Sequence, residues 1–336
     1  MTDFSTLDPE LAAAVEMLPK IAFSNLAETR TTFESLMASA LAGLDTSGVE
    51  LSILSAPGYE DEDPDVAIRF FAPESAQGRI PVLMWVHGGG FATGTAQGAD
   101  PICIAVVRAL GIAVASVEYR LAPETPFPGP VDDCYAALKY LHSNAVDLAI
   151  DPDAIAVGGQ SAGGGLAAGT VLMARDKGEV PVAFQLLDIP ELDDRLETTS
   201  MKTFVDTPVW NRANAILSWR YYLGQSYLGP TDATVSPYAA PSRATDLSGL
   251  PRTYISTMEL DPLRDEGIAY ALALLHVGVS VELHSFPGTF HGSSLIAAAV
   301  SQRQMTELIG ALGRGLNVSV PAQCPEPFRV RQELDH

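Results

Sequence analysis

The stretch Gly158-Gly159-Gln160-Ser161-Ala162-Gly163-Gly164-Gly165 decides how this chain folds. It follows the apolar run 154–157, which is typical of a short buried strand. It precedes residues 166–175, whose composition favours a helix. Glycines on both sides of a serine predict a turn too tight for side chains next to it. We therefore expect a strand–turn–helix unit, with the Ser161 hydroxyl projecting from the C-terminal end of the strand.

This turn has two chemical interpretations. Gly159-Gln160-Ser161-Ala162-Gly163 fits the G-x-S-x-G nucleophile elbow, and the helix that follows directs its positive dipole end towards the serine. Residues 163–168 also fit the looser G-x-G-x-x-G/A dinucleotide fingerprint. The plainest alternative is a glycine-rich turn that carries a surface serine. Residues elsewhere in the chain have to separate these interpretations.

Strand patterns and helix patterns alternate on both sides of the turn. Strands are expected at residues 49–55, 66–71, 82–86, 112–117, 155–158, 182–187, 253–257 and 280–286. Helices are expected at residues 31–41, 98–110, 131–142, 161–175, 209–223, 264–276 and 302–312. The first two strands predict an antiparallel pair at a sheet edge. The later alternation predicts an α/β fold, with a mostly parallel eight-stranded sheet and helices on both faces.

The pattern divides the chain into four parts. Residues 1–45 form an N-terminal helical cap segment, 46–190 and 231–316 form the α/β core, 191–230 form a cap insertion, and 317–336 form a tail that we expect to be disordered. The insertion is rich in aromatic residues. They either form the core of the cap or cover a pocket at the carboxyl ends of the strands, where open α/β sheets bind ligands.

Composition limits the class of protein. The 336 residues are 47% hydrophobic, which is enough for one large domain or for two. A net charge of −21 argues against nucleic acid and anionic membranes as partners, because binding phosphate needs clustered Lys and Arg. The three cysteines are far apart in the sequence, and no signal peptide or membrane span is evident. We therefore expect a cytoplasmic protein.

The motif His87-Gly88-Gly89-Gly90 follows an expected strand well before Ser161. Consecutive glycines let backbone N–H groups turn towards one point. Together with the amide of Ala162, the amides of Gly88, Gly89 and Gly90 would form an oxyanion hole. The alternatives are a phosphate-cradling turn and a plain flexible loop. We expect His87 to brace this loop rather than to act as a base.

A base and an acid are expected downstream of the serine, because the order in this architecture is Ser, then Asp or Glu, then His. His291 is the histidine that follows the last strand, at the carboxyl edge of the sheet. Asp261 follows the preceding strand, and its Asp-Pro turn fixes the carboxylate early in the loop. Glu259 is the second choice for the acid. Asp265 is interpreted as a helix first-turn acid or an ion-pair partner of Arg264.

Five motifs in order resemble the bacterial hormone-sensitive-lipase family of α/β-hydrolase esterases. They are His87-Gly88-Gly89-Gly90, Tyr119-Arg120-Leu121-Ala122-Pro123-Glu124, Gly158-Gly159-Gln160-Ser161-Ala162-Gly163-Gly164, Asp261-Pro262-Leu263-Arg264-Asp265 and Phe290-His291-Gly292. The resemblance covers nearly the whole chain except the tail. It implies an α/β-hydrolase fold with a helical cap. Residues 6–11, 158–165 and 189–197 look closest to members that hydrolyse acetyl esters. Gln160 departs from the family, because most members carry Asp there.

We therefore expect a serine carboxylesterase that uses Ser161, Asp261 and His291, with no cofactor and no metal. Its partner would be a small-molecule ester of a short acyl group, with a bulky aromatic or alkaloid alcohol. The question of a homo-oligomer stays open. The substrate pocket is expected to include Phe91, Gln160 and Trp210. Amidase activity, thioesterase activity and a non-catalytic ligand-binding role remain alternatives, whereas a dinucleotide site leaves the HGGG motif unexplained.

Overall fold

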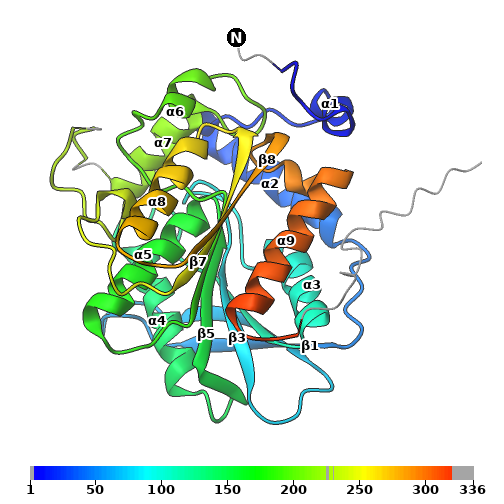
Figure 1. Cartoon of the computed structure of the whole chain (residues 1–336), viewed down its shortest axis with the longest axis vertical. Coiled ribbons are helices and arrows are strands. Elements are labelled where there is room, and N and C mark those ends of the chain that lie inside the picture. Colours follow the sequence, from blue (N-terminus) through cyan, green and yellow to red (C-terminus); the bar gives the residue numbers. More distant parts are fainter. Residues whose placement is uncertain (1–3, 225–226, 230, 320–336) are drawn as a thin grey trace, which may run out of the picture.

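The computed structural model describes residues 4–224, 227–229 and 231–319. Within them, a sheet of eight strands lies between layers of helices (Figure 1). The strand order is β1-β2-β4-β3-β5-β6-β7-β8. The pairs β1–β2 and β2–β4 are antiparallel, and the other neighbouring strands are parallel. This arrangement confirms the predicted α/β class, including the antiparallel pair at the edge.

All the predicted strands and helices are present, with different boundaries in places. The strands are β1 Val49–Ala56, β2 Val66–Pro73, β3 Ile80–Val86, β4 Ala113–Val117, β5 Ile150–Gln160, β6 Phe184–Asp188, β7 Arg252–Leu260 and β8 Val281–Phe290. The helices are α1 Pro9–Val15, α2 Leu26–Leu41, α3 Asp100–Leu110, α4 Gly129–Ser143, α5 Ala162–Lys177, α6 Thr199–Thr203, α7 Arg212–Leu223, α8 Arg264–His276 and α9 Ala299–Gly315, with the short 3-10 turn η1 at Phe23–Asn25.

Several boundaries differ from the sequence-based ranges, and two of them show why. Strand β8 continues past residue 286 to Phe290, because Phe290 still pairs with Leu260 beyond an irregularity in the ladder. Helix α2 begins at Leu26 rather than at residue 31. Asn25 caps its first turn by accepting a hydrogen bond from the amide of Glu28 at 3.4 Å. Both corrections depend on partners that periodicity alone does not reveal.

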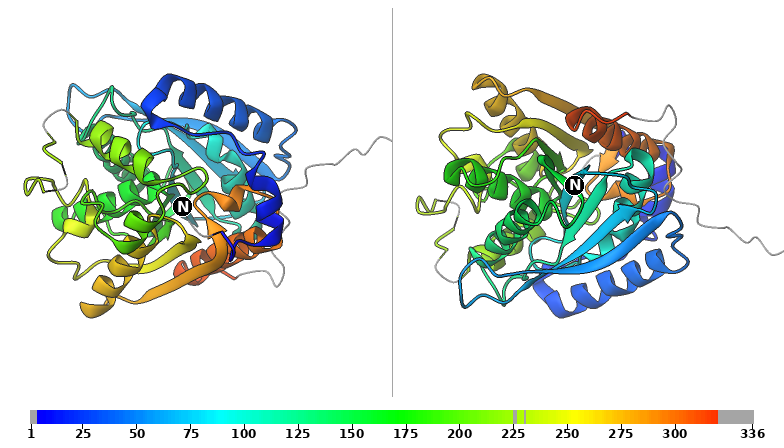
Figure 2. Two further views of the ribbon diagram at one scale, coloured as in Figure 1. Left: turned by 90° about the horizontal axis from the view of Figure 1, so that it is seen from above. Right: turned by 90° about the horizontal axis from the view of Figure 1, so that it is seen from below.

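Each face of the sheet has its own helices. Helices α4, α5 and α8 cover one face with Leu138, Leu172 and Leu274. Helices α3 and α9 cover the other face with Val107 and Leu312. All five side chains are buried. Figure 2 shows the sheet running between these layers when it is viewed along the strands. Because both faces are covered, every residue of the inner strands β4 and β6 is buried.

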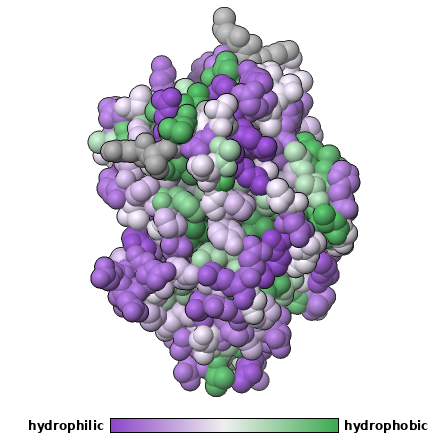
Figure 3. Space-filling model, turned by 90° about the vertical axis from the view of Figure 1, so that its left-hand side faces the viewer, coloured by the Kyte–Doolittle hydropathy of each residue, from purple (hydrophilic) through white to green (hydrophobic). Residues whose placement is uncertain are grey.

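The carboxyl termini of β5 and β7 point to the upper end of the molecule in Figure 1, where α6 and α7 also lie. Hydrophilic side chains cover much of the face shown in Figure 3, with hydrophobic side chains in smaller groups between them. Among the described helices, none combines the length and apolar character that crossing a bilayer requires. Most of the predicted tail, from residue 320 onward, lies outside the described residues.

Candidate active site

The predicted turn joins β5 to α5. Ser161 lies between the two elements with φ of 57° and ψ of −124°, a left-handed conformation that costs a non-glycine residue free energy. A Cβ atom on Gly163 would overlap the backbone oxygens of Val86 and His87, so only glycine lets α5 approach β3 this closely. The amide of Ser161 donates to the Asp188 carbonyl at 2.8 Å. These constraints hold the Ser161 side chain at the carboxyl edge of the sheet.

Three side chains from distant parts of the sequence form a hydrogen-bonded chain at this edge. Ser161 Oγ lies 2.8 Å from His291 Nε2, and His291 Nδ1 lies 2.7 Å from Asp261 Oδ2. All three residues are buried. The second Asp261 oxygen accepts the amide of Leu263 at 2.8 Å, which fixes the orientation of the carboxylate. Such a chain can remove a proton from the hydroxyl and stabilise the resulting imidazolium.

The two alternative acids have other partners. Asp265 accepts the Ser200 amide at 2.7 Å and the Arg264 guanidinium at 2.8 Å. This matches its interpretation as an ion-pair partner of Arg264. Glu259 accepts the Gly288 amide at 2.6 Å. The structure therefore places Asp261 against His291, whereas the other two carboxylates bond to groups outside the Ser161–His291 pair.

The HGGG motif forms a loop directly beside Ser161. A Cβ on Gly88 would lie 3.4 Å from the Ser161 Cβ, whereas Gly89 and Gly90 have φ values of 125° and 55°. Within the described part of the chain, the amides of Gly89, Gly90 and Ala162 donate no hydrogen bond. Free N–H groups next to a nucleophile are what an oxyanion hole requires.

His87 supports this loop through a hydrogen bond and a stacked ring. Its Nδ1 lies 2.8 Å from the Gly88 carbonyl oxygen, and its ring stacks on Tyr119 with the centroids 4.3 Å apart. The Tyr119 hydroxyl donates to the His87 carbonyl at 2.9 Å. Burial lowers the pKa of His87 to about 4, so the imidazole is neutral at pH 7 and donates through Nδ1.

The three predicted pocket residues lie in different surroundings. The Trp210 ring is near His291, with the centroids 5.8 Å apart. Phe91 is fully buried and stacks on Tyr222 at 4.1 Å. The Gln160 amide nitrogen donates to the Asp188 carboxylate at 2.8 Å. Of the three, Trp210 is therefore the predicted pocket residue whose side chain lies next to the hydrogen-bonded residues Ser161, His291 and Asp261.

Sequence reasoning did not find Phe23, which lies beside Trp210. Their rings meet edge to face at 5.1 Å, and a Cβ on Gly90 would come within 2.6 Å of both rings. Asn214 holds this segment in place by accepting the Phe23 amide at 3.1 Å. We call Phe23 and Trp210 the roof, because both rings lie against Gly90 and the Trp210 ring also lies near His291. No local signal marks Phe23, because its hydrogen-bond partners Asn214 and Tyr221 are 191 and 198 positions away in the sequence.

Asp188 was also missed, and it explains the departure at Gln160. Its carboxylate accepts hydrogen bonds from Gln160 at 2.8 Å, Ser256 at 2.5 Å and Gln304 at 3.1 Å, and all three are neutral donors. An Asp at position 160 would bring a second carboxylate to this buried acid and could not donate when ionised. Gln160 therefore supplies a donor that the usual family residue lacks.

One group of potential metal ligands occurs among the described residues, at Glu282, His284 and Glu307. His284 Nε2 faces Glu282 at 3.1 Å, and His284 Nδ1 faces Glu307 at 3.9 Å. Arg314 also pairs with Glu282 at 2.5 Å. We interpret the group as a surface ion-pair cluster.

Comparison with known proteins places the chain in a family. The family model described as having the alpha/beta hydrolase fold matches residues 83–295. A solved structure of bacterial heroin esterase is 68% identical, with a TM-score of 0.92, and the match covers 93% of this chain and 99% of that one. The structure of esterase LipW from Mycobacterium marinum is 36% identical, with a TM-score of 0.84, and the match covers 93% and 96% of the two chains.

A curated relative agrees with these structures. Carboxylesterase NlhH of Mycobacterium tuberculosis is 39% identical over 264 residues, which are 77% of this chain and 79% of that protein. The chain therefore belongs to the α/β-hydrolase fold family, in its hormone-sensitive-lipase-like branch. It is a carboxylic ester hydrolase. The class predicted from the five sequence motifs is confirmed.

Proposed function

We propose that Ser161 is the nucleophile of this esterase. Its Oγ attacks the ester carbonyl carbon while His291 Nε2 takes the hydroxyl proton, and the carbonyl oxygen becomes an oxyanion. When the tetrahedral intermediate collapses, the bond to the alcohol breaks, and His291 returns the proton to the leaving oxygen. The acyl group stays on Ser161 until water, deprotonated by His291, releases it as an acid. The hydrogen bond of 2.8 Å between Ser161 and His291 is the observation that carries this proposal.

Asp261 and the HGGG loop would support both steps. Asp261 holds His291 in the tautomer that presents Nε2 to the serine, and it stabilises the imidazolium. The amides of Ala162 and of the Gly88–Gly90 loop would bind the oxyanion. Each such donor contributes a factor of about 10²–10³ to turnover in enzymes of this type.

The substrate we propose is a short-chain ester, of the acetyl type, with a bulky aromatic alcohol. In this proposal the Trp210 ring, 5.8 Å from His291 between centroids, contacts the alcohol of a bound ester, and Phe23 supports it from the side. One of the similar solved structures is named bacterial heroin esterase, and that name indicates an alkaloid ester as its substrate. The net charge of −21 would attract a cationic alkaloid ester over long range. In this proposal residues 1–45 and 191–230 form the cap over the site.

Labelling with a fluorophosphonate probe tests the nucleophile. The wild-type protein should react with one equivalent of probe, and Ser161→Ala should not react. Turnover of p-nitrophenyl acetate by Ser161→Ala should fall by several orders of magnitude, on the order of 10⁶ at the extreme. A folded Ser161→Ala protein that keeps more than a few per cent of wild-type turnover would show that another residue is the nucleophile.

Chain-length dependence tests the acyl side. We expect kcat/KM for p-nitrophenyl esters to be highest for acetate or butyrate and to fall at octanoate and palmitate. The physical reason is that the proposed acyl site is small, so longer chains lose contacts or clash. A maximum at octanoate or longer, or a rate jump above the solubility limit of the substrate, would contradict the proposal.

A further inference from the structure

Glu191 is a buried carboxyl group beside the site that the proposed mechanism does not use. Its amide donates to the Ser161 carbonyl at 3.0 Å, and its side chain is fully buried. Its Oε2 lies 3.4 Å from the Ser218 hydroxyl of α7. Its Oε1 has no hydrogen-bond partner among the described residues. A carboxylate in such a place would be costly if ionised, so its protonation state is of interest.

Ser218 connects this carboxyl group to the HGGG loop. Its Oγ donates to the Gly90 carbonyl oxygen at 3.1 Å. A hydroxyl carries one hydrogen, so Ser218 cannot donate to Gly90 and to Glu191 at the same time. While Ser218 donates to Gly90, its contact with Glu191 is favourable only when Glu191 carries a proton and donates it. An ionised Glu191 would compete with Gly90 for the one hydrogen.

Among the described residues, the charged group that acts on Glu191 is the carboxylate of Asp261, which favours the neutral form of Glu191. Glu266 and Tyr119 also face Glu191, but burial raises the pKa of each, so both are neutral at pH 7. Within the described part of the chain, no Lys or Arg pairs with Glu191. Burial raises the pKa of Glu191 to about 8, with a smaller contribution from the Asp261 charge, whereas a hydrogen bond from the Ser218 hydroxyl acts in the opposite direction. Glu191 is therefore protonated at pH 7 and loses its proton at mildly alkaline pH.

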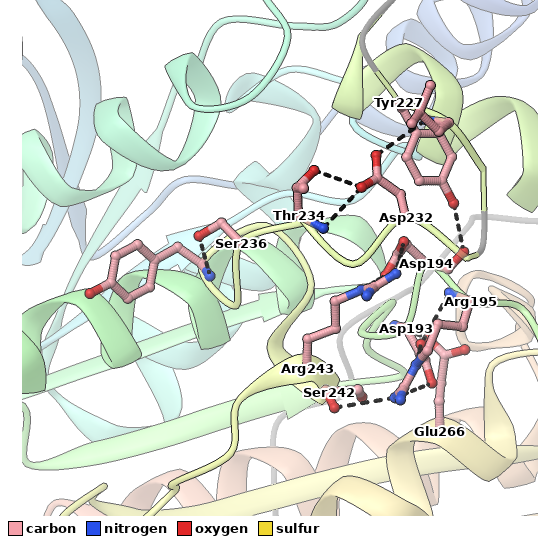
Figure 4. Close-up of polar contacts among 12 residues, drawn as sticks. Asp193, Asp194, Arg195, Tyr227, Asp232, Thr234, Ser236, Ser242, Arg243 and Glu266 are labelled. Carbon is pink, nitrogen blue, oxygen red and sulfur yellow. Dashed lines mark hydrogen bonds and ion pairs between the residues drawn. The ribbon is translucent and has the colours of Figure 1, made fainter.

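Hydrogen bonds and ion pairs hold the backbone after Glu191 in place. Figure 4 shows the segment held by the Arg243–Asp194 ion pair, and Arg195 pairs with Asp193 at 2.6 Å. Glu266 accepts the amides of Leu192 at 2.6 Å and Asp193 at 3.2 Å. With the main chain fixed, the Ser218 hydroxyl is the part that can respond by rotating.

We propose that neutral Glu191 is a positioning residue for the HGGG loop. It keeps Ser218 oriented towards the Gly90 carbonyl, and loss of its proton turns Ser218 away and loosens the loop. The inference rests on the proposed oxyanion role of that loop. It predicts that turnover falls at alkaline pH for a reason that lies outside the chain of Ser161, His291 and Asp261.

The test compares kcat and KM for p-nitrophenyl acetate between pH 6 and 9.5 in four proteins, with the folded Ser161→Ala protein as the blank. In wild type, kcat should fall about tenfold above pH 8, a smaller loss than removal of a whole oxyanion donor causes. Glu191→Gln should match wild type within about twofold at pH 7 and should not fall, because its amide donates to Ser218 at every pH. Ser218→Ala should be about tenfold slower at pH 7, with KM unchanged and no alkaline fall.

Glu266→Gln is the matched control, because Glu266 is another buried acid with a raised pKa. It lies on α8 and accepts the amides of Leu192 and Asp193, and among the described residues it makes no hydrogen bond to the HGGG loop. This variant should keep the wild-type alkaline fall. The proposal is overturned if Glu191→Gln falls like wild type, or if Ser218→Ala keeps wild-type turnover and the alkaline fall. These outcomes leave the nucleophile assignment standing as long as Ser161→Ala is inactive. An active Ser161→Ala protein would instead overturn the proposed function itself.

Discussion

Asp261 and Asp265 lie on the same turn after β7, and their different partners lead to a residue-scale prediction. Asp261→Asn should reduce kcat on the order of 10⁴, because an amide can no longer hold His291 in the productive tautomer. Asp265→Asn should cost less than about tenfold, since its bonds go to Ser200 and Arg264 and not to His291. Both variants are assayed at saturating p-nitrophenyl acetate, with circular dichroism to verify folding. An equal loss in both, or the reverse order, would contradict the assignment.

The residues that could be predicted from the sequence are those with a local signature. Ser161 is framed by glycines, Asp261 precedes a proline, and His291 follows the last strand, so order and turn chemistry were enough to propose them. Glu191 and Asp188 have no such signature. Their significance comes from burial and from partners on other elements, such as Ser218 and Gln304, which only the folded chain brings together.

At the scale of elements, the roof leads to a prediction about the alcohol. Trp210→Ala and Phe23→Ala should each lower kcat/KM for phenyl acetate about tenfold more than for ethyl acetate. Loss of one aromatic contact, worth about 0.5–1.5 kcal/mol beyond its buried area, accounts for that ratio. The comparison needs only initial rates at low substrate concentration.

Trp219→Phe is the matched control, because Trp219 is a buried aromatic residue of α7 whose ring contacts among the described residues are with Phe91 and Tyr222, at 5.3 and 6.1 Å between centroids, and not with His291. It should change kcat/KM for both esters by the same factor. If Trp210→Ala also changes both equally, Trp210 only packs the cap and does not contact the alcohol.

Elements were predicted well where apolar periodicity was strong, and less well at their ends. Helix α8 was predicted with the bounds that the structure has, because its turn residues mark both ends. Strand β5 begins at Ile150, before the predicted residue 155, because Ile150 pairs with Ile80 across an irregular register. The acidic residues Asp151 and Asp153 conceal that part of the strand in the sequence pattern.

At the scale of the whole molecule, buried groups set the pH dependence of stability. The pKa of Glu191 is about 8 in the fold and 4.5 ordinarily, so between these values the folded state holds a proton that the unfolded chain has lost. Stability therefore falls as the pH rises through this window. His87 acts in the opposite direction. Its pKa is about 4 in the fold and 6.5 ordinarily, so stability falls as the pH drops from 6.5 to 4.

Urea unfolding of wild type and Glu191→Gln at pH 5 and pH 8.5 checks this effect. The two proteins should have similar free energies of unfolding at pH 5, where Glu191 is neutral in the fold. At pH 8.5 the variant should be more stable by a few kcal/mol, on the order of the shift at 1.36 kcal/mol per pKa unit. The loss below pH 6.5 that His87 causes should remain in both. A difference between the two proteins that does not change with pH would contradict the raised pKa.

The roof also has a consequence for the order in which the protein is made. Phe23 leaves the ribosome long before Asn214, the residue that holds its amide from 191 positions away. A nascent chain can complete β1 to β5 and the serine turn before Trp210, the second residue of the roof, has been synthesised. Alcohol selectivity, if the roof confers it, is therefore acquired only after α7 has emerged. The N-terminal segment that carries Phe23 therefore lacks these partners until a segment from the second half of the chain has been synthesised.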